Sequence, residues 1–334
     1  VTPSVPKVSN YVVVTEVFPP AIGGSGRWLW EIYSRFTKGS VTIIAAQTPG
    51  KEPLETALDI RRIPFSFPTW SVIRSVSAYF RVVWAVMKEA RRCGAREIHV
   101  ARALPEGWAA YLACLVLKAR YTCFVHGEEV AYAQSSRELR WAMGVVYRNA
   151  HGIIVNSAST KRILSEAYGD QLPDINVVHP GVDAGWYVPA ASSPTRREAL
   201  GWTERRVLLS VGRLQRRKGH DTVIRALPAI VSAIPDVLYC VVGDGEEEAS
   251  LRTLAGALGV EPFVQFRGAA DDDELLRCYQ ECQLFVMPNR VVDGDVEGFG
   301  IVFLEAQACG VPVVAGATGG PPEALSEPET GPVV

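Results

Sequence analysis

The chain has 334 residues, enough for two domains of ordinary size, and 48% of them are hydrophobic, as expected for a globular protein. Its 34 basic and 36 acidic residues give a formal net charge of −2. This near-neutral balance argues against nucleic acid as the main partner, which would favour a basic chain. The seven cysteines are scattered and form no Cys-x-x-Cys pair, so we interpret them as reduced core residues.

No signal-peptide pattern begins the sequence, and no apolar run reaches the roughly 18 to 20 residues that a membrane span needs. The apolar stretch 112–117, for example, stops at Lys118. We therefore expect a soluble, cytoplasmic protein.

The first half alternates short apolar segments, typical of buried strands, with segments of helical spacing. The predicted strands are 11–15, 41–46, 98–100, 121–125, 152–155 and 175–178. A glycine-rich loop, 23–26, follows the first strand, and a long helix is predicted over 72–92. Ser157 is placed to cap the helix after the fifth strand.

The pattern lapses over 180–205, where the small polar and proline residues 189–194 are typical of a linker. Further strands are predicted at 206–211, 237–242, 263–266, 284–287 and 311–315. Repeated strand–helix alternation predicts an α/β protein of two doubly wound, Rossmann-like parallel-sheet domains facing a central cleft. We place the N-terminal domain at 1–182 and the C-terminal domain at 183–334, with a linker over about 183–205.

The most informative stretch is 295–320. Glu297 stands in front of a Gly-Phe-Gly tripeptide, and Glu305 follows eight positions later inside a helix predicted to begin near Gly300. Carboxylates beside free backbone amides at a helix N-terminus suit sugar hydroxyls or a ribose diol. The alternative for Glu297 is a capping or helix-dipole role. Glu305 fits that alternative less well, because an unpaired charge inside an apolar helix is costly.

Two other features follow predicted strands, where ligands of parallel sheets bind. The pair Gly23 and Gly24 would let backbone amides approach a phosphate, although an ordinary tight turn explains it as well. His126 comes directly after the strand 121–125, where both a structural and a functional role are open.

A basic loop follows the strand 206–211. Arg213 and Lys218 lie beside a predicted helix start and suit a diphosphate, with a solvated basic loop as the alternative. We expect Arg216 and Arg217 to be surface residues.

The tripeptide Asp293-Gly294-Asp295 is also a pattern by which some nucleotide-sugar enzymes hold a metal ion. It lies late in the chain, in a loop, rather than at a strand end of an N-terminal nucleotide domain. We therefore predict no metal site.

Glu297 and Glu305, with seven residues between them and AQACGVPVVAGATGG after them, resemble the signature of the retaining GT-B glycosyltransferases of family 4 (group 1). The similarity extends over most of the chain and is greatest to bacterial GDP-mannose-dependent alpha-mannosyltransferases of the phosphatidylinositol mannoside type. It implies transfer of a hexose, here mannose, from a nucleotide-diphosphate sugar to a hydroxyl of a lipid-linked or cell-envelope glycan. It also implies that the anomeric configuration is retained and that the reaction needs neither a cofactor nor a metal. It also implies further C-terminal elements after Val334.

The resemblance places the acceptor on the N-terminal domain and the nucleotide sugar on the C-terminal domain. The implied catalytic residues are His126, Arg213, Lys218 and Glu297. The implied donor-binding residues are Gly23, Gly24, Gly243, Arg267, Phe299, Gly300 and Glu305. In the family, the Arg–Lys pair neutralises the departing diphosphate, the first glutamate holds a sugar hydroxyl, and the second holds the ribose diol.

Three alternatives stay open. A UDP-sugar-dependent glucosyl or N-acetylglucosaminyl transferase would share the fold. A phosphorylase or epimerase would share the architecture, but no pyridoxal-phosphate lysine signature is evident. A non-catalytic nucleotide-sugar-binding protein is disfavoured, because all the implied catalytic residues are present.

One helical segment mixes aromatic and basic side chains. They are Trp70, Arg74, Tyr79, Phe80, Arg81 and Trp84. Two interpretations remain: peripheral contact with the inner face of a membrane, where a lipid-linked acceptor would lie, or packing of the aromatic stripe against the sheet.

Overall fold

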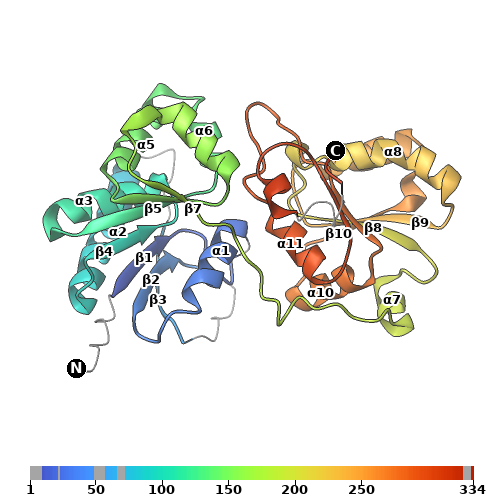
Figure 1. The fold of residues 1–334 in the computed structure, drawn as a ribbon, viewed down its shortest axis with the longest axis horizontal. Coiled ribbons are helices and arrows are strands. Elements are labelled where there is room, and N and C mark those ends of the chain that lie inside the picture. The colour runs from blue at the N-terminus through green and yellow to red at the C-terminus, as the bar shows by residue number, and fades with distance from the viewer. Residues whose placement is uncertain (1–9, 22, 49–56, 66–71, 326–331) are drawn as a thin grey trace, which may run out of the picture. The chain divides into compact units, whose positions relative to one another are not determined.

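The computed structural model describes residues 10–21, 23–48, 57–65, 72–325 and 332–334. The chain divides into two compact units, Val1–Pro180 and Gly181–Val334. Both are α/β units built on a parallel sheet, as predicted (Figure 1, first unit blue to green, second unit yellow to red).

The sheet of the first unit has seven parallel strands in the order β3-β2-β1-β4-β5-β6-β7. The strands are β1 (Tyr11–Thr15), β2 (Val41–Ala46), β3 (Asp59–Ile63), β4 (Glu97–Val100), β5 (Arg120–Val125), β6 (Gly152–Val155) and β7 (Ile175–Val177). In the central register, Val13 pairs with Ile43 on one side and His99 on the other. Strand β3 was not predicted, because its two arginines break the apolar pattern at this half-exposed sheet edge.

Helices cover both faces of this sheet. They are α1 (Gly24–Tyr33), α2 (Val72–Cys93), α3 (Trp108–Leu117), α4 (Glu128–Ala133), α5 (Arg137–Asn149) and α6 (Ala158–Tyr168). The two-residue period of β5 separates the faces. Cys123 and Val125 join the core formed with α2, α3, α5 and α6. Phe124 points the other way and meets Trp28 of α1, with ring centroids 5.2 Å apart.

The second unit has five parallel strands in the order β10-β9-β8-β11-β12. The strands are β8 (Arg206–Val211), β9 (Val237–Val242), β10 (Val264–Gly268), β11 (Leu284–Met287) and β12 (Val313–Ala315). The helices are α7 (Pro194–Leu200), α8 (His220–Ala233), α9 (Glu248–Ala257), α10 (Asp272–Glu281) and α11 (Ile301–Ala308). Near the C-terminus, Val333 forms a parallel bridge with Ala315 of β12.

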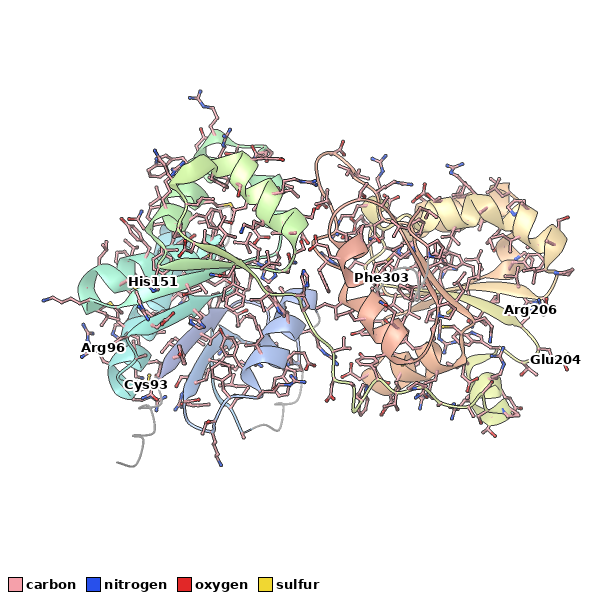
Figure 2. All side chains as sticks on the ribbon, viewed as in Figure 1. Cys93, Arg96, His151, Glu204, Arg206 and Phe303 are labelled. Atoms are coloured by element: carbon pink, nitrogen blue, oxygen red, sulfur yellow. The ribbon has the colours of Figure 1, made fainter. Side chains whose placement is uncertain are left out.

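Successive side chains of β9 point to opposite faces of the sheet, and each face has its own hydrophobic core. Cys240 packs on the face covered by α10 and α11, whereas Tyr239 packs on the face covered by α8 and α9. Phe303, labelled on α11 in Figure 2, packs edge to face against Phe285 of β11, with ring centroids 5.3 Å apart. Helix α11 is therefore held against the strand whose end leads into the predicted site.

The stretch predicted as a linker contains α7, which is anchored to the second unit. Ser193 caps α7 with its side chain, and Pro194 stands at the first helical position, both ordinary helix-start signals. The buried carboxylate of Glu281 accepts hydrogen bonds from the Ser192 hydroxyl at 2.6 Å and from Arg196 Nε at 2.7 Å. Residues from 192 onward therefore belong to the second unit.

Among the described residues, none of the helices combines the length and apolarity that crossing a bilayer requires. All seven cysteines are free thiols, and five of them are buried.

Glu106 is a fully buried acid in the turn Ala103–Gly107 between β4 and α3. Its Oε1 accepts the Glu16 N–H at 2.8 Å, which ties the turn to the loop after β1. Its Oε2 is buried without a hydrogen-bond partner among the described residues. Burial raises the pKa of this carboxyl to about 7, although the charge of Arg102 opposes the rise.

Stability of the protein should consequently fall as the pH rises through the range that separates the pKa of Glu106 in the unfolded and folded chains. The unfolded carboxyl ionises near pH 4.5 and the folded one near 7, so the folded state binds more protons in between. Between pH 5 and pH 8, ionisation of this group should lower the free energy of unfolding by about 2–3 kcal/mol. Urea unfolding at both pH values should show that Glu106→Gln loses less stability than the wild type. Equal losses would contradict the burial argument.

Candidate active site

The loops that follow β8 and β11 pack tightly together at the carboxyl edge of the second sheet. Gly219, at the end of the loop after β8, has φ +76°, and a Cβ there would lie 2.2 Å from the carbonyl oxygen of Pro288. Only glycine fits this close approach. The contact sets the basic loop of residues 213–218 beside the loop that leads to Glu297.

An ionic cluster results. Lys218 Nζ lies 2.5 Å from Glu297 Oε2, and Arg217 Nη1 lies 2.7 Å from the same oxygen. Arg217 Nε also lies 3.0 Å from Asp295 Oδ2, and its side chain is only 6% exposed. The prediction that Arg217 is a surface residue is therefore wrong, because two carboxylates hold its guanidinium inside. Arg216 is exposed, as expected.

The cluster keeps Glu297 ionised. Burial alone would raise the pKa of the Glu297 carboxyl, but the charges of Lys218 and Arg217 outweigh burial and bring the pKa below its usual value. A largely buried anion with two cations on one oxygen is suited to accept a hydrogen bond from a hydroxyl.

Glu297 does not cap the helix that follows it. The N-cap of α11 is Gly300, in the left-handed region at φ +88°, and no side chain caps this helix start. Phe299, next to the cap, packs its ring in the core with Phe303. The predicted donor-binding roles of Phe299 and Gly300 therefore concern their backbone only.

The carboxylates of the Asp-Gly-Asp tripeptide differ in surroundings. Asp295 pairs with Arg217, whereas Asp293 is exposed in a left-handed turn at φ +52°. Within the described parts of the chain, no group of three or more His, Cys, Asp or Glu side chains is arranged to hold a metal ion. One of the two candidate ligands is thus already engaged by a guanidinium.

Glu305 lies inside α11, as predicted, and is buried. Its Oε2 accepts a hydrogen bond of 2.7 Å from the hydroxyl of Tyr279, a fully buried residue of α10. Burial, and next the Glu305 charge, raise the pKa of Tyr279 far above its usual range. The phenol is therefore a permanent donor, which offsets part of the cost of a carboxylate in an apolar helix.

Gly243 and Arg267, two predicted donor-binding residues, already have partners in the protein. The Gly243 N–H donates to the carbonyl of Gly268 at 2.7 Å. The Arg267 side chain donates from Nε to Glu274 Oε1 and from Nη1 to the Leu200 carbonyl, both at 2.9 Å. The side chain of Arg267 is therefore paired within the protein.

In the first unit, the structure gathers His126 and the glycine loop at one sheet edge. His126 follows β5, and its ring contacts that of Trp28 in α1, the helix that begins at Gly24. Arg102, which follows β4, donates from Nη2 to the Ser25 hydroxyl at 3.3 Å. A Cβ at Gly24 would meet no heavy atom within 4 Å, so the space beside this residue is open.

His126 is held in one orientation as a neutral imidazole. Its Nε2 lies 2.9 Å from the carbonyl of Ala101, which can only accept, so Nε2 carries the proton. The backbone N–H of His126 donates to the Glu129 carboxylate, and the backbone carbonyl of His126 accepts from the Asn156 side chain. Burial lowers the pKa of His126 despite the opposing charge of Glu129, so the ring is uncharged at neutral pH.

Sequence reasoning missed four residues that position this chemistry: Arg102, Asn156, Arg217 and Tyr279. Asn156 directly follows β6 and Arg102 is the second residue after β4, so the rule that selected His126 could have found them. Tyr279 gives no such signal, because its contact with Glu305 joins two helices.

Comparison with known proteins identifies the family of the chain. A model of "Glycosyl transferases group 1" matches residues 192–334, and one of "Glycosyltransferase Family 4" matches residues 22–186. The chain is 32% identical to a GDP-mannose-dependent monoacylated alpha-(1-6)-phosphatidylinositol monomannoside mannosyltransferase of Corynebacterium glutamicum, over 97% of this chain and 84% of the relative. It is 33% identical to a GDP-mannose-dependent alpha-(1-6)-phosphatidylinositol monomannoside mannosyltransferase of Mycobacterium tuberculosis, over 98% and 85% respectively.

Solved structures resemble the chain in fold. The crystal structure of Anabaena HepE in complex with UDP and glucose has a TM-score of 0.77 and covers 98% of this chain and 85% of its own. Its sequence identity is 20%, so this likeness concerns the fold alone.

Proposed function

The chain belongs to the glycosyltransferases of family 4, and from this membership we propose that it transfers mannose from GDP-mannose to a hydroxyl acceptor, with retention and without a metal ion. Its two parallel-sheet units have the GT-B fold, and it is a hexosyltransferase. The observation that carries the proposal is the convergence of Lys218 and Arg217 on Glu297 at the carboxyl edge of the second sheet. The donor assignment is supported by relatives whose names specify GDP-mannose.

In this proposal the second unit binds the donor. Arg213 and Lys218 neutralise the diphosphate as the glycosidic bond breaks, and the ionised Glu297 accepts a hydrogen bond from a mannose hydroxyl. The departing phosphate itself takes up the acceptor proton on the same face of the sugar. Catalysis then comes from positioning and electrostatic stabilisation by groups that the loops already hold in place.

The first unit supplies His126 and binds the acceptor. A neutral imidazole fixed by Ala101 suits a hydrogen bond to a sugar hydroxyl near the reacting carbon. The backbone around Gly23 and Gly24 lies at the start of α1, where amides favour an anionic group.

In this proposal a lipid-linked acceptor is reached along the neighbouring helices α2 and α3 of the first unit, whose exposed side chains we call the α2–α3 face. Its apolar members are Phe80, Trp84, Leu112, Leu115 and Val116. Phe80 and Trp84 are 71% and 62% exposed, so packing against the sheet does not explain them. Tyr79 is half-buried, Trp70 lies outside the described residues, and the side chain of Arg74 is not described.

Basic groups accompany the apolar members of this face. Arg81 is exposed beside Phe80, and Lys88 Nζ lies 5.1 Å from the Trp84 ring centroid. Aromatic and aliphatic groups among cations suit the interface of a bilayer with anionic headgroups. We assign the α2–α3 face to peripheral contact with such a membrane.

The donor assignment is tested by a panel of GDP-mannose, UDP-glucose and UDP-N-acetylglucosamine. GDP-mannose at 100 times its dissociation constant should stabilise the protein by about 2.7 kcal/mol. It should be turned over with release of GDP in excess EDTA, and NMR of the product should show the donor's anomeric configuration. Preference for a UDP sugar would establish the alternative donor. A complete loss in EDTA that metal restores would return Asp293 and Asp295 to a role in the reaction.

The ribose assignment is tested by Glu305→Gln, which keeps the shape of the side chain but loses its charge. Hydrogen bonds to charged groups contribute about 1.5–3 kcal/mol, against about 1 for neutral pairs. Calorimetry should show affinity for the nucleoside diphosphate falling at least about tenfold. A 2′-deoxy nucleotide should bind the wild type more weakly and lose most of that difference in the variant. The exposed Glu198→Gln serves as control. Absence of coupling to the 2′-hydroxyl would disprove the assignment.

The membrane assignment is tested by sedimentation with vesicles containing phosphatidylglycerol. Phe80→Ser combined with Trp84→Ser should reduce the bound fraction several-fold, because two exposed apolar anchors are lost. Turnover of a water-soluble acceptor should not change. Leu258→Ser, at an exposed position of the second unit, provides the matched control. Equal vesicle binding by the double variant and the wild type would contradict the assignment.

A further inference from the structure

The two cations on Glu297 are held in different ways. The ammonium of Lys218 has Glu297 as its only ion-pair partner among the described residues, at 2.5 Å. The guanidinium of Arg217 bridges two carboxylates, with Nη1 on Glu297 and Nε on Asp295, and its side chain is nearly inaccessible to solvent. Arg217 is therefore fixed from two sides, and Lys218 from one.

Their chemistry reinforces this difference. A lysine ammonium is a compact charge on a flexible stem and can turn toward a new anion, whereas arginine offers a rigid planar fork that matches paired carboxylates. A diphosphate that reaches the loop after β8 therefore competes for Lys218 with Glu297. Arg217 has no equivalent freedom to leave.

The consequence concerns the charge of Glu297 after such an exchange. A largely buried carboxylate that loses both counter-ions becomes strongly destabilised and takes up a proton. A protonated Glu297 would donate rather than only accept, and it would no longer stabilise positive charge beside it. A second, permanent cation prevents this.

We propose that Arg217 is a positioning residue that keeps Glu297 ionised and in place when Lys218 moves to the diphosphate of the donor. Lys218 is then the exchangeable counter-ion and Arg217 the permanent one. The inference rests on the proposed function, since it requires a nucleotide-diphosphate sugar as ligand. It assigns a role to Arg217 that needs no contact with the substrate.

The main test is the pH profile of kcat for Arg217→Gln at saturating donor. With Lys218 on the diphosphate, the variant leaves Glu297 without a cation, so the acid limb of kcat should move at least one unit to higher pH. At pH 7, kcat should fall about tenfold or more. Affinity for the nucleoside diphosphate should change less than about threefold, because Lys218 and Arg213 remain.

Two further variants separate this role from a structural one. Arg216→Gln, an exposed neighbour on the same loop, should leave kcat and its pH profile unchanged. Arg217→Lys retains one positive charge and should return the acid limb close to that of the wild type, with kcat still reduced because a point charge cannot bridge both carboxylates.

A comparison in a Glu297→Gln background covers the case in which Arg217→Gln alone does not fold. In that background the carboxylate that needs Arg217 is gone, so adding Arg217→Gln should lower kcat no further than Glu297→Gln does by itself. A further fall in kcat there would overturn the inference, as would an acid limb of Arg217→Gln that does not move. Absence of turnover by the wild type with every donor would instead overturn the proposed function and this inference with it.

Discussion

The contact of Glu297 with Lys218 and Arg217 is the constraint on which the candidate site of the second unit depends. Ion pairs that are largely removed from water stabilise little by themselves, because desolvation offsets much of the attraction. They are kept in place here by the backbone: Gly219 lets the loop after β8 approach Pro288, and the strands hold both loops at one edge. The sheet thus fixes three charges within hydrogen-bond distance before any ligand is present, and a ligand does not have to assemble them.

The two sheet edges differ in their electrostatics. In the second unit, the edge carries a cluster of full charges around Glu297, suited to a group that leaves with negative charge. In the first unit, His126 is uncharged and oriented through Ala101 and Asn156, so it offers directional hydrogen bonds instead. Such a division suits a transfer in which one partner is a diphosphate and the other a neutral hydroxyl.

Most of the fold followed from periodicity, because buried parallel strands are continuous apolar runs and their ends locate a site. The exceptions have specific causes. Strand β3 carries Arg61 and Arg62 at a half-exposed edge, and α7 is short and begins in a proline-rich stretch. The position of Glu305 inside a helix was predictable from the local pattern. The burial of Arg217 was not, because it depends on Asp295, nearly 80 positions away, and no local pattern carries that information.

Tyr279 and Glu305 show how the unit tolerates a charge within an apolar helix. The phenol that donates to Glu305 comes from α10, and its ring also packs against Tyr187 and Phe285, so its orientation is set by the core itself. A carboxylate placed this way keeps its position whether or not a ligand is bound, since its partner cannot rotate without disturbing the packing. The core of the second unit therefore orients the carboxylate proposed for the ribose, whereas loops orient the one proposed for the sugar. The rigid setting of Glu305 matches the ribose, which stays unchanged in the reaction. The exchangeable ion pairs of Glu297 match the sugar, which reacts.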